Sequence, residues 1–209
     1  MIFNYIKLSF RKFTRQKFYS LLNILGLATG MATVILILLY VMDELSYDKF
    51  HRHADNLYRV VENQYYSGQP VFPVAVTPGP LAEALASDFP EVEKATRAHY
   101  GWNAFQHHES KFDGKGIYVD PEFLQMFDYP LISGDTATAL DEINSLVVTA
   151  EFATKLFGEE NPIGKTVTVN RDREVLVTAV MKNIPKNSHL QFDFIMPMRR
   201  RLVEIPAFA

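Results

Sequence analysis

The stretch LLNILGLATGMATVILILLYVM, Leu21 to Met42, decides how this chain is organised. It holds 22 residues without a charged side chain in a chain of 209 residues. As a helix that rises about 1.5 Å per residue it would extend roughly 33 Å, which matches a hydrocarbon core of about 30 Å. A buried helix of a soluble protein rarely stays uncharged for so long, and a signal peptide ends in a small-x-small cleavage site that LYVMDELSYD lacks. We therefore predict a retained transmembrane helix over residues 21–42.

Basic residues precede this span and acidic residues follow it. No Asp or Glu occurs before Asp43, and the chain beyond the basic segment carries 16 basic and 24 acidic residues, a formal charge of −8. Because Lys and Arg near a span stay on the cytoplasmic side, residues 1–20 are predicted to be cytoplasmic and residues 43–209 to form an extracytoplasmic domain. An outer domain of this charge does not suit nucleic acid, whose phosphates require a basic surface. The orienting residues carry a charge of +5 and are Lys7, Arg11, Lys12, Arg15 and Lys17.

Two interpretations of residues 1–20 stay open. One is an amphipathic helix that lies among the lipid headgroups, with apolar and basic residues on separate faces. The other is a basic flank that only fixes the topology. Membrane lipid is a partner in both, since the span itself lies in lipid. The apolar face of such a helix would hold Ile2, Ile6, Phe10 and Phe13, and its basic face Lys7, Arg11 and Arg15.

Small residues within the span indicate a packing face. Gly26 and Gly30 form a G-x-x-x-G motif, and Ala28 and Ala32 repeat the small-x-x-x-small spacing. Small residues one turn apart let two helix backbones approach closely in lipid, where the hydrophobic effect does not drive association. We expect this helix to pack against another membrane helix through Gly26 and Gly30.

The chain after the span predicts an α+β domain with a mixed sheet, because strand and helix patterns alternate loosely. No second run of 18 apolar residues occurs, so one span is predicted. In the last predicted strand Leu190, Phe192 and Phe194 alternate with polar residues, as in a half-buried strand. The predicted strands cover residues 56–66, 95–107, 116–119, 144–149, 165–170, 173–181 and 190–196.

Capping residues mark three predicted helices. The first is expected to begin at Thr77 and Pro78, the second at Asp120 and the third at Thr149, and Gly158 supplies the stop of the third. Residues 198–209 show neither strand nor helix periodicity. The apolar faces are formed by Leu81, Leu85 and Phe89 in the first helix and by Phe152 and Leu156 in the third.

No motif predicts a catalytic residue, a cofactor or a metal ion. In LFGEENPIGKTVTVN, Leu156 to Asn170, five residues separate Gly158 from Gly164, whereas a phosphate-binding loop has four and follows a strand. We interpret this stretch as a helix stop followed by a turn into a strand. An H-E-x-x-H zinc motif fails because Phe112 occupies its last position, and the chain has neither a G-x-S-x-G elbow nor a cysteine.

The histidines and paired carboxylates are interpreted as surface or loop residues. Adjacent carboxylates beside turns are more often solvated charges than an acid/base pair. This interpretation covers His51, His53, His107, His108, Glu109 and the pairs Asp43-Glu44, Asp141-Glu142 and Glu159-Glu160.

Several blocks together resemble one family of membrane proteins. They are the basic N-terminus, NILGLATGMA within the span, DELSYDKFH after it, and the later blocks NSLVVTAEFATKLFGEENPIGKTV and IPKNSHLQFDF. The combination is similar to permease subunits of the macrolide-exporter and FtsX-like (MacB-type) ABC transporters, from the first residues to about Met198. The resemblance implies structural roles for the motif residues Asn161, Pro162, Gly164, Asn187, Ser188, His189, Phe192 and Asp193.

The resemblance also implies a function and partners. Such permeases are non-catalytic, lie in the bacterial inner membrane and pair with a separate cytoplasmic ABC ATPase, usually as a homodimer or heterodimer of permeases. They couple ATP hydrolysis to motion of a periplasmic domain, for export or cell-envelope signalling. The family continues with three further spans, so we expect this chain to be an N-terminal portion whose outer domain is incomplete at its end.

Two other functional classes are compared with this one. A single-pass sensor or interaction protein would bind a ligand with its outer domain and dimerise through Gly26 and Gly30. A membrane-anchored hydrolase is disfavoured by the failed motifs, and would need a strongly perturbed carboxylate or histidine pair in a deep cleft. An adjacent ATPase gene would favour the permease over the sensor.

Overall fold

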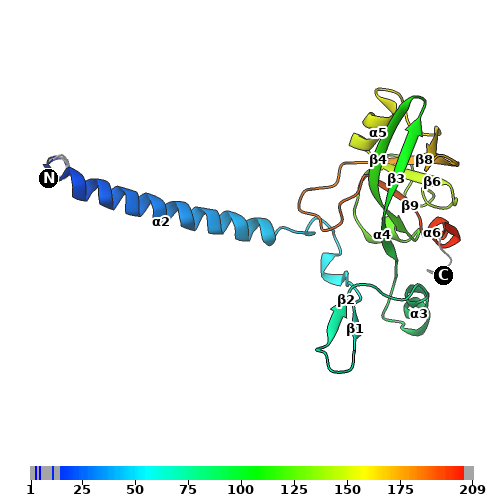
Figure 1. Cartoon of the computed structure of the whole chain (residues 1–209), viewed down its shortest axis with the longest axis horizontal. Helices are drawn as coiled ribbons and strands as arrows, with labels where there is room; N and C mark the ends of the chain where they lie inside the picture. Colours follow the sequence, from blue (N-terminus) through cyan, green and yellow to red (C-terminus); the bar gives the residue numbers. More distant parts are fainter. Residues whose placement is uncertain (1–2, 4, 6–10, 12–14, 205–209) are drawn as a thin grey trace. The chain divides into compact units, whose positions relative to one another are not determined.

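A computed structural model describes residues 3, 5, 11 and 15–204 of the chain. The chain divides into two compact units, Met1–Tyr47 and Asp48–Ala209. The first contains a long helix and the second a sheet with short helices (Figure 1). The predicted fold class, α+β with one apolar N-terminal helix ahead of a mixed sheet, is confirmed.

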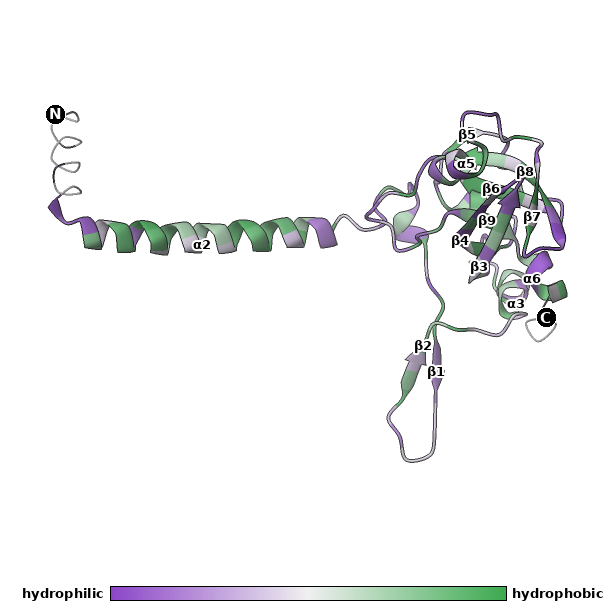
Figure 2. Ribbon diagram, turned by 45° about the horizontal axis from the view of Figure 1, so that its top comes forward, coloured by the Kyte–Doolittle hydropathy of each residue, from purple (hydrophilic) through white to green (hydrophobic). Residues whose placement is uncertain are grey.

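The apolar stretch forms one continuous helix, α2 (Lys17–Glu44), of 28 residues. Its length and composition allow it to cross a membrane, and it has no buried residue. Hydrophobic residues follow one another along most of its length (Figure 2), as in a helix surrounded by lipid. Helix α2 begins before Leu21 and ends after Met42, because a helix need not end where the hydrocarbon does. Of the predicted N-terminal segment, Ile2, Ile6, Phe10, Phe13, Lys7 and Lys12 lie outside the described residues.

The second unit is built on a seven-stranded mixed sheet. Its strand order is β5-β8-β6-β9-β4-β3-β7, and β7 also pairs with β8. The pairs β4/β9 and β6/β8 are parallel and the remaining pairs are antiparallel. The strands are β3 (Ala98–His107), β4 (Ser110–Val119), β5 (Leu131–Ser133), β6 (Ser145–Thr149), β7 (Thr166–Val169), β8 (Arg173–Met181) and β9 (Phe194–Pro197).

Each face of this sheet is covered by its own apolar cluster. One cluster joins the sheet to α5 (Ala150–Phe157) and α6 (Met198–Glu204) through residues such as Phe152, Phe194 and Met198. The other joins it to α4 (Phe123–Met126) through Phe123, Tyr129 and Phe192. The central strands β6 and β9 are buried at every residue, since they have a cluster on each side.

Helix α5 follows its predicted caps. The Thr149 side chain accepts a hydrogen bond from the backbone N–H of Phe152 at 3.3 Å, and Gly158 ends the helix at φ +62°. A turn then leads into β7, so LFGEENPIGKTVTVN is a helix stop, a turn and a strand, as interpreted.

Two predicted helices begin elsewhere. Helix α3 (Leu81–Asp88) starts after Pro80 and not at Thr77, because Pro80 would be the third helical residue and lacks the N–H that a capping side chain can bind there, and Phe89 lies beyond its end. Helix α4 starts after Glu122 and not at Asp120. The Asp120 carboxylate instead binds Arg97 through the backbone N–H and the guanidinium.

The last predicted strand begins later than expected, and a helix follows it where none is predicted. Strand β9 starts at Phe194, because Gln191 folds back onto the carbonyl groups of Pro185 and Ser188 and the preceding residues form a turn. Residues 198–204 form α6, although no periodicity was predicted there. Its residues Met198 and Leu202, four apart, face the first cluster.

The strand predicted over residues 56–66 is only three residues long. Strand β1 (Glu62–Gln64) pairs with β2 (Phe72–Val74) in a separate two-stranded sheet, and a short 3-10 helix, η1 (Ala54–Asn56), precedes it. The residues between η1 and β1 have strand composition but no partner strand among the described residues.

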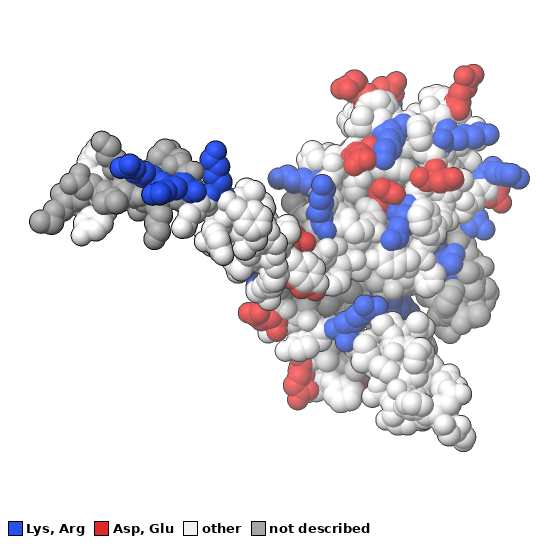
Figure 3. Space-filling view, turned by 60° about the vertical axis from the view of Figure 1, so that its left-hand side comes forward, with Lys and Arg blue, Asp and Glu red and all other residues white. Residues whose placement is uncertain are grey.

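On the face in Figure 3, acidic and basic side chains of the outer unit are interspersed.

Candidate functional site

The segment directly after α2 is held by a loop from the far end of the sequence. Asp48 donates its backbone N–H to the carbonyl of Asn187 at 2.9 Å. The backbone N–H of His189 donates to Oδ1 of Asp48 at 3.0 Å, and Nδ1 of His189 lies 2.7 Å from Oδ2. Two quoted blocks, DELSYDKFH and IPKNSHLQFDF, therefore meet at Asp48. We call residues 48–52 with residues 187–193 the juxtamembrane joint.

Asp48 also has an unusual backbone conformation. Its φ is +55°, in the left-handed region that few residues other than glycine, Asn and Asp adopt. This turn points its N–H at the 187–193 loop, and the following residues then enter the domain. The contact with His189 offsets part of the cost of this conformation.

Phe50 and His51 insert into the second apolar cluster. The His51 ring is 5% exposed, and its centroid lies 4.0 Å from that of Phe50, 5.2 Å from Phe127 and 5.3 Å from Tyr129. Phe192 contacts the same group, with its ring centroid 5.3 Å from that of Tyr129. His51 lies in a loop, as one half of the expectation had it, but it is not a surface histidine, because these aromatic rings remove it from water.

The buried His51 ring is held in its neutral form. The backbone N–H of Asp128 donates to its Nδ1 at 3.0 Å, so this nitrogen carries no proton. Burial lowers the pKa of His51 and outweighs the carboxylates of Asp48 and Asp128, which raise it. The Asp128 carboxylate in turn accepts hydrogen bonds from Arg52, at 2.7 Å from its backbone N–H and 2.7 Å from Nε.

Ser188 fastens the middle of the 187–193 loop. Its hydroxyl lies 3.1 Å from the hydroxyl of Tyr129 and 3.2 Å from the carbonyl of Leu190, which it can donate to. Burial raises the pKa of Tyr129 to about 12, against the opposing effect of the Ser188 hydrogen bond. The tyrosine therefore stays neutral at any ordinary pH, and its hydroxyl keeps its proton for a hydrogen bond with Ser188.

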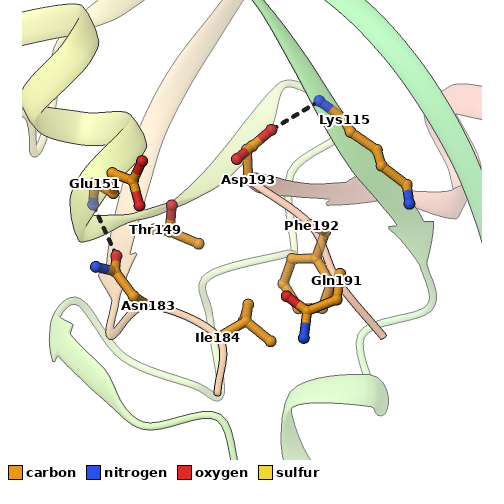
Figure 4. A pocket seen from close by; sticks show the side chains of 8 residues that line it. All are labelled: Lys115, Thr149, Glu151, Asn183, Ile184, Gln191, Phe192 and Asp193. Carbon is orange, nitrogen blue, oxygen red and sulfur yellow. Dashed lines mark hydrogen bonds between the residues drawn. The ribbon is translucent and has the colours of Figure 1, made fainter. Parts of the chain in front are cut away.

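Asp193 joins the end of this loop to two strands. Its carboxylate accepts the backbone N–H of Lys115 at 2.9 Å, and its carbonyl accepts the N–H of Thr149 at 2.9 Å. Around it lies a shallow pocket of about 210 Å³ (Figure 4). The acids there are engaged: Glu151 binds Lys155, and its backbone N–H binds Asn183. The pocket is thus a structural junction of β4, β6 and the loop.

The predicted turn at Asn161, Pro162 and Gly164 lies at a different place. The Asn161 side chain accepts the N–H of Ile163 at 3.1 Å, and Gly164, at φ +78°, donates its N–H to Val177 of β8 at 2.9 Å. The ammonium of Lys165 forms an ion pair with Glu160. Within the described residues, the hydrogen bonds of this turn run inside it and to β8.

The predicted membrane residues lie in the first unit. Gly26 and Gly30 lie on helix α2, and a Cβ added at either would meet no atom within 4 Å. Arg11, Arg15 and Lys17 have exposed side chains, and Lys7 and Lys12 lie outside the described residues.

Sequence reasoning missed half of the joint. It singled out residues 187–193 but gave no role to Asp48, His51, Arg52 or Asp128. The block DKFHR places an acid, an aromatic residue, a histidine and a base within five positions directly after a membrane span. That density of side chains capable of directed contacts is the pattern that could have drawn attention to it.

A family profile and several solved structures match this chain. A profile described as "MacB-like periplasmic core domain" matches residues 20–206. No curated protein matches the sequence. Among solved structures, a domain of a protein named as a permease from Porphyromonas gingivalis is similar, with TM-score 0.57, 25% identity and coverage of 66% of this chain and 60% of that one.

Two other solved structures match more weakly. The extracellular domain of the noncanonic ABC-type transporter YknZ from Gram-positive bacteria gives TM-score 0.49 and 16% identity, over 60% of this chain and 64% of that one. The periplasmic region of MacB from Actinobacillus actinomycetemcomitans gives 0.49 and 18%, over 60% and 56%. The chain thus spans about three-fifths of the length of each solved relative. Because the family profile covers most of its residues, the chain belongs to the MacB-like periplasmic core domain family of ABC-transporter permeases.

Proposed function

We propose that this chain is a non-catalytic portion of an ABC permease that couples ATP hydrolysis by a separate cytoplasmic ATPase to motion of its outer domain. Family membership and helix α2 support an inner-membrane protein with an extracytoplasmic domain. In detail, residues 1–20 are cytoplasmic, 21–42 cross the membrane and 43–209 lie outside, since the basic residues precede the span. The motion serves export or cell-envelope signalling.

The observation that carries this proposal is the position of the juxtamembrane joint. Only Leu45 to Tyr47 separate the last residue of α2 from Asp48. The four Cα–Cα steps from Glu44 to Asp48 span at most about 14 Å when fully extended, so the slack between the helix end and the first bonded residue of the domain is limited. A movement of the helix end larger than this slack must pull on Asp48.

A displacement of Asp48 can reach the sheet through two sets of contacts. One passes through His189 and along the loop to Asp193, whose bonds reach β4 and β6. The other passes through Phe50 and His51 into the aromatic cluster beside α4. Interdigitated side chains transmit displacement because protein interiors are densely packed.

The remaining roles follow from the same proposal. The Gly26 and Gly30 face packs against another membrane helix, within a pair of permeases. Lys7, Arg11, Lys12, Arg15 and Lys17 hold the N-terminus at the cytoplasmic membrane surface. The Asn161-Pro162 and Gly164 turn shapes the outer domain, and no residue of the chain acts as a catalyst or holds a cofactor.

The test uses the full chain co-expressed with an ABC ATPase of the same organism. We expect the ATPase to co-purify with the chain in lipid nanodiscs, and a reporter fused after Met198 to be active only outside the cytoplasm. A fluorescent label on Lys186→Cys, the sole cysteine of that variant, should change its emission when ATP is added. Asp48→Ala should abolish this change and the exposed neighbour Lys49→Ala should preserve it.

Other outcomes reject the proposal in identifiable ways. Reporter activity in the cytoplasm would overturn the topology. A chain that forms dimers but never retains the ATPase would instead support the single-pass sensor. An ATP response that Asp48→Ala leaves intact would reject the joint as the coupling route.

A further inference from the structure

His51 is a buried titratable group in the short stretch that ties the end of α2 to the outer unit. Of the chain's six histidines, all of which the structure describes, only His51 is buried. It belongs to the juxtamembrane joint, and Phe50 beside it packs against the second apolar cluster. A histidine at this position makes the joint sensitive to protons, because the charge of a histidine changes between about pH 5 and 8.

The hydrogen bond at Nδ1 and a charge on the ring exclude each other. Nδ1 of His51 accepts the backbone N–H of Asp128 at 3.0 Å, whereas a charged imidazolium carries a proton on both nitrogens and accepts no hydrogen bond. The rings of Phe50, Phe127 and Tyr129 surround His51, so water cannot solvate a charge there. Protonation therefore requires the ring to leave its site.

Two carboxylates lie where a released imidazolium can bind them. Burial opposes a proton on His51, and the charges of Asp48 and Asp128 favour one. These carboxylates are 39% and 20% exposed, so both can be reached from water. In the observed arrangement they bind His189 and Arg52 instead. A second arrangement is thus available, in which a charged His51 outside the aromatic cluster pairs with these acids.

Release of the ring loosens the rest of the stretch. The His51 ring centroid lies 4.0 Å from that of Phe50, and the backbone N–H of its other neighbour, Arg52, binds Asp128 at 2.7 Å. Asp48 has φ +55°, a conformation whose cost its bonds to the 187–193 loop offset. Because near-consecutive residues make these contacts, a ring that leaves the cluster pulls on all of them.

We propose that residues 48–52 form a proton-operated switch, in which mild acid on the outer side charges His51 and releases this stretch from the outer domain. In the released form a movement of α2 reaches Asp48 but is no longer passed to the sheet. As a regulator of coupling, the switch rests on the proposed permease function. The release itself does not depend on that function.

The pH window of the switch follows from the sign of the shift. Burial lowers the pKa of His51, so the released ring takes up a proton at a higher pH than the held ring. Above about pH 6.5 both forms are neutral and the held form keeps its full advantage. Below that pH the ratio of released to held form rises by up to about tenfold per pH unit, until the held ring is protonated too.

Hydrogen exchange of the unaltered chain in lipid nanodiscs tests the release. The backbone N–H groups of Asp48, Arg52, Asp128 and His189 all donate to acceptors within the joint. Their protection, corrected for the intrinsic exchange rate at each pH, should fall together by up to about tenfold per pH unit below about pH 6.5. The amides of strand β8 should keep their protection, because the domain itself stays folded.

Two variants assign the effect to His51. His51→Gln does not titrate, so its protection, whatever its size, should no longer fall between about pH 7.5 and 5.5. His53→Gln, at an exposed neighbouring position, is the matched control and should behave as the unaltered chain does. A charge on His189 strengthens its contact with the Asp48 carboxylate, so titration of His189 acts against release and cannot imitate it.

The fluorescent label on Lys186→Cys connects the switch to coupling. The change in emission on addition of ATP should shrink from about pH 7.5 to 5.5 in the chain that carries His51. In the His51→Gln background the change should be the same at both pH values. The rate of ATP hydrolysis is measured in the same samples, so that an effect of acid on the ATPase is separated from release of the joint.

Four results would overturn the inference. They are protection of residues 48–52 that is equal at both pH values, an equal loss of protection in β8, a fall that persists in His51→Gln, and an ATP response that acid leaves unchanged although the stretch is released. A chain without an ATP response at either pH would reject the permease function, while hydrogen exchange would still decide the switch. An ATP response together with constant protection would reject the switch and leave the permease function standing.

Discussion

Asp48 and His189 stand 141 residues apart in the sequence, yet both carboxylate oxygens of Asp48 bind His189, one the backbone N–H at 3.0 Å and the other Nδ1 at 2.7 Å. The contact closes the outer unit between its first residue and the loop before its last strand. The segment that follows helix α2 is thereby bonded to a loop that comes close to it only when the domain is folded.

The Asp48 contact can be measured by a double-mutant cycle. The side chains are 39% and 72% exposed, so water screens the pair and we expect a coupling free energy of about 0.5–1 kcal/mol. Asp48→Ala, His189→Ala and the double variant are unfolded in urea in detergent micelles, with Trp102 fluorescence as the readout. Lys49→Ala should not change the free energy of unfolding. A coupling energy indistinguishable from zero would show that the contact has no energetic role.

The buried His51 should make the outer domain less stable in mild acid. Because burial lowers its pKa, the unfolded chain takes up a proton more readily than the folded one as pH falls below about 6.5. The stabilisation is fully present above that pH and is lost progressively below it. We expect His51→Gln to reduce the slope of unfolding free energy against pH between about pH 7 and 5.

Two comparisons sharpen the His51 measurement. His99, whose pKa is lowered by burial and by Arg201, should leave a residual slope in the His51→Gln variant. His53→Gln, at an exposed neighbouring position, should keep the slope of the unaltered chain. An identical slope in His51→Gln and the unaltered chain would contradict the burial argument.

Gly116 permits the close approach of Phe194 to strand β4. A Cβ at Gly116 would lie 2.3 Å from Cε2 of the Phe194 ring, a rigid group in the core. Gly116→Ala should therefore lower the free energy of unfolding by about 1–3 kcal/mol through overpacking. Ser110→Ala, an exposed position on the same strand, is the control. Phe194→Leu in the Gly116→Ala background should recover part of the loss, and a neutral Gly116→Ala would refute the packing account.

Lys165 should have no part in nucleotide binding. Its ammonium pairs with Glu160 and lies 5.7 Å from the centroid of the Phe157 ring, in a turn that leads from a helix into a strand. A phosphate loop has the reverse order and the spacing that this turn lacks. Titration with a fluorescent ATP analogue should give the same absence of binding for the unaltered chain and Lys165→Ala. A measurable affinity that Lys165→Ala abolishes would disprove this interpretation.

Local chemistry explains why several elements were predictable from the residues alone. Helix α2 needs only an uncharged stretch of sufficient length, and Thr149 and Gly158 delimit α5 through bonds and dihedral angles within a few residues. The turn at Asn161 likewise depends on neighbouring atoms. In each case the partners that decide the conformation are close in sequence.

Other features depended on partners that no local pattern names. Residues 198–204 form a helix because Met198 and Leu202 pack against an apolar cluster. The carboxylate of Asp120 does not cap a helix because it binds Arg97. His51 is indistinguishable from a surface histidine until rings from residues 123–129 surround it.

The sequence by itself determined that this chain has an apolar helix long enough to cross a membrane, a basic segment before it and an α+β domain after it, since length, charge and periodicity are properties of the chain. Only the tertiary structure decided that Asp48 meets His189 and that His51 is buried. Those outcomes depend on which strands pair and which loops cross, and contacts over more than a hundred residues form only when the whole sheet assembles.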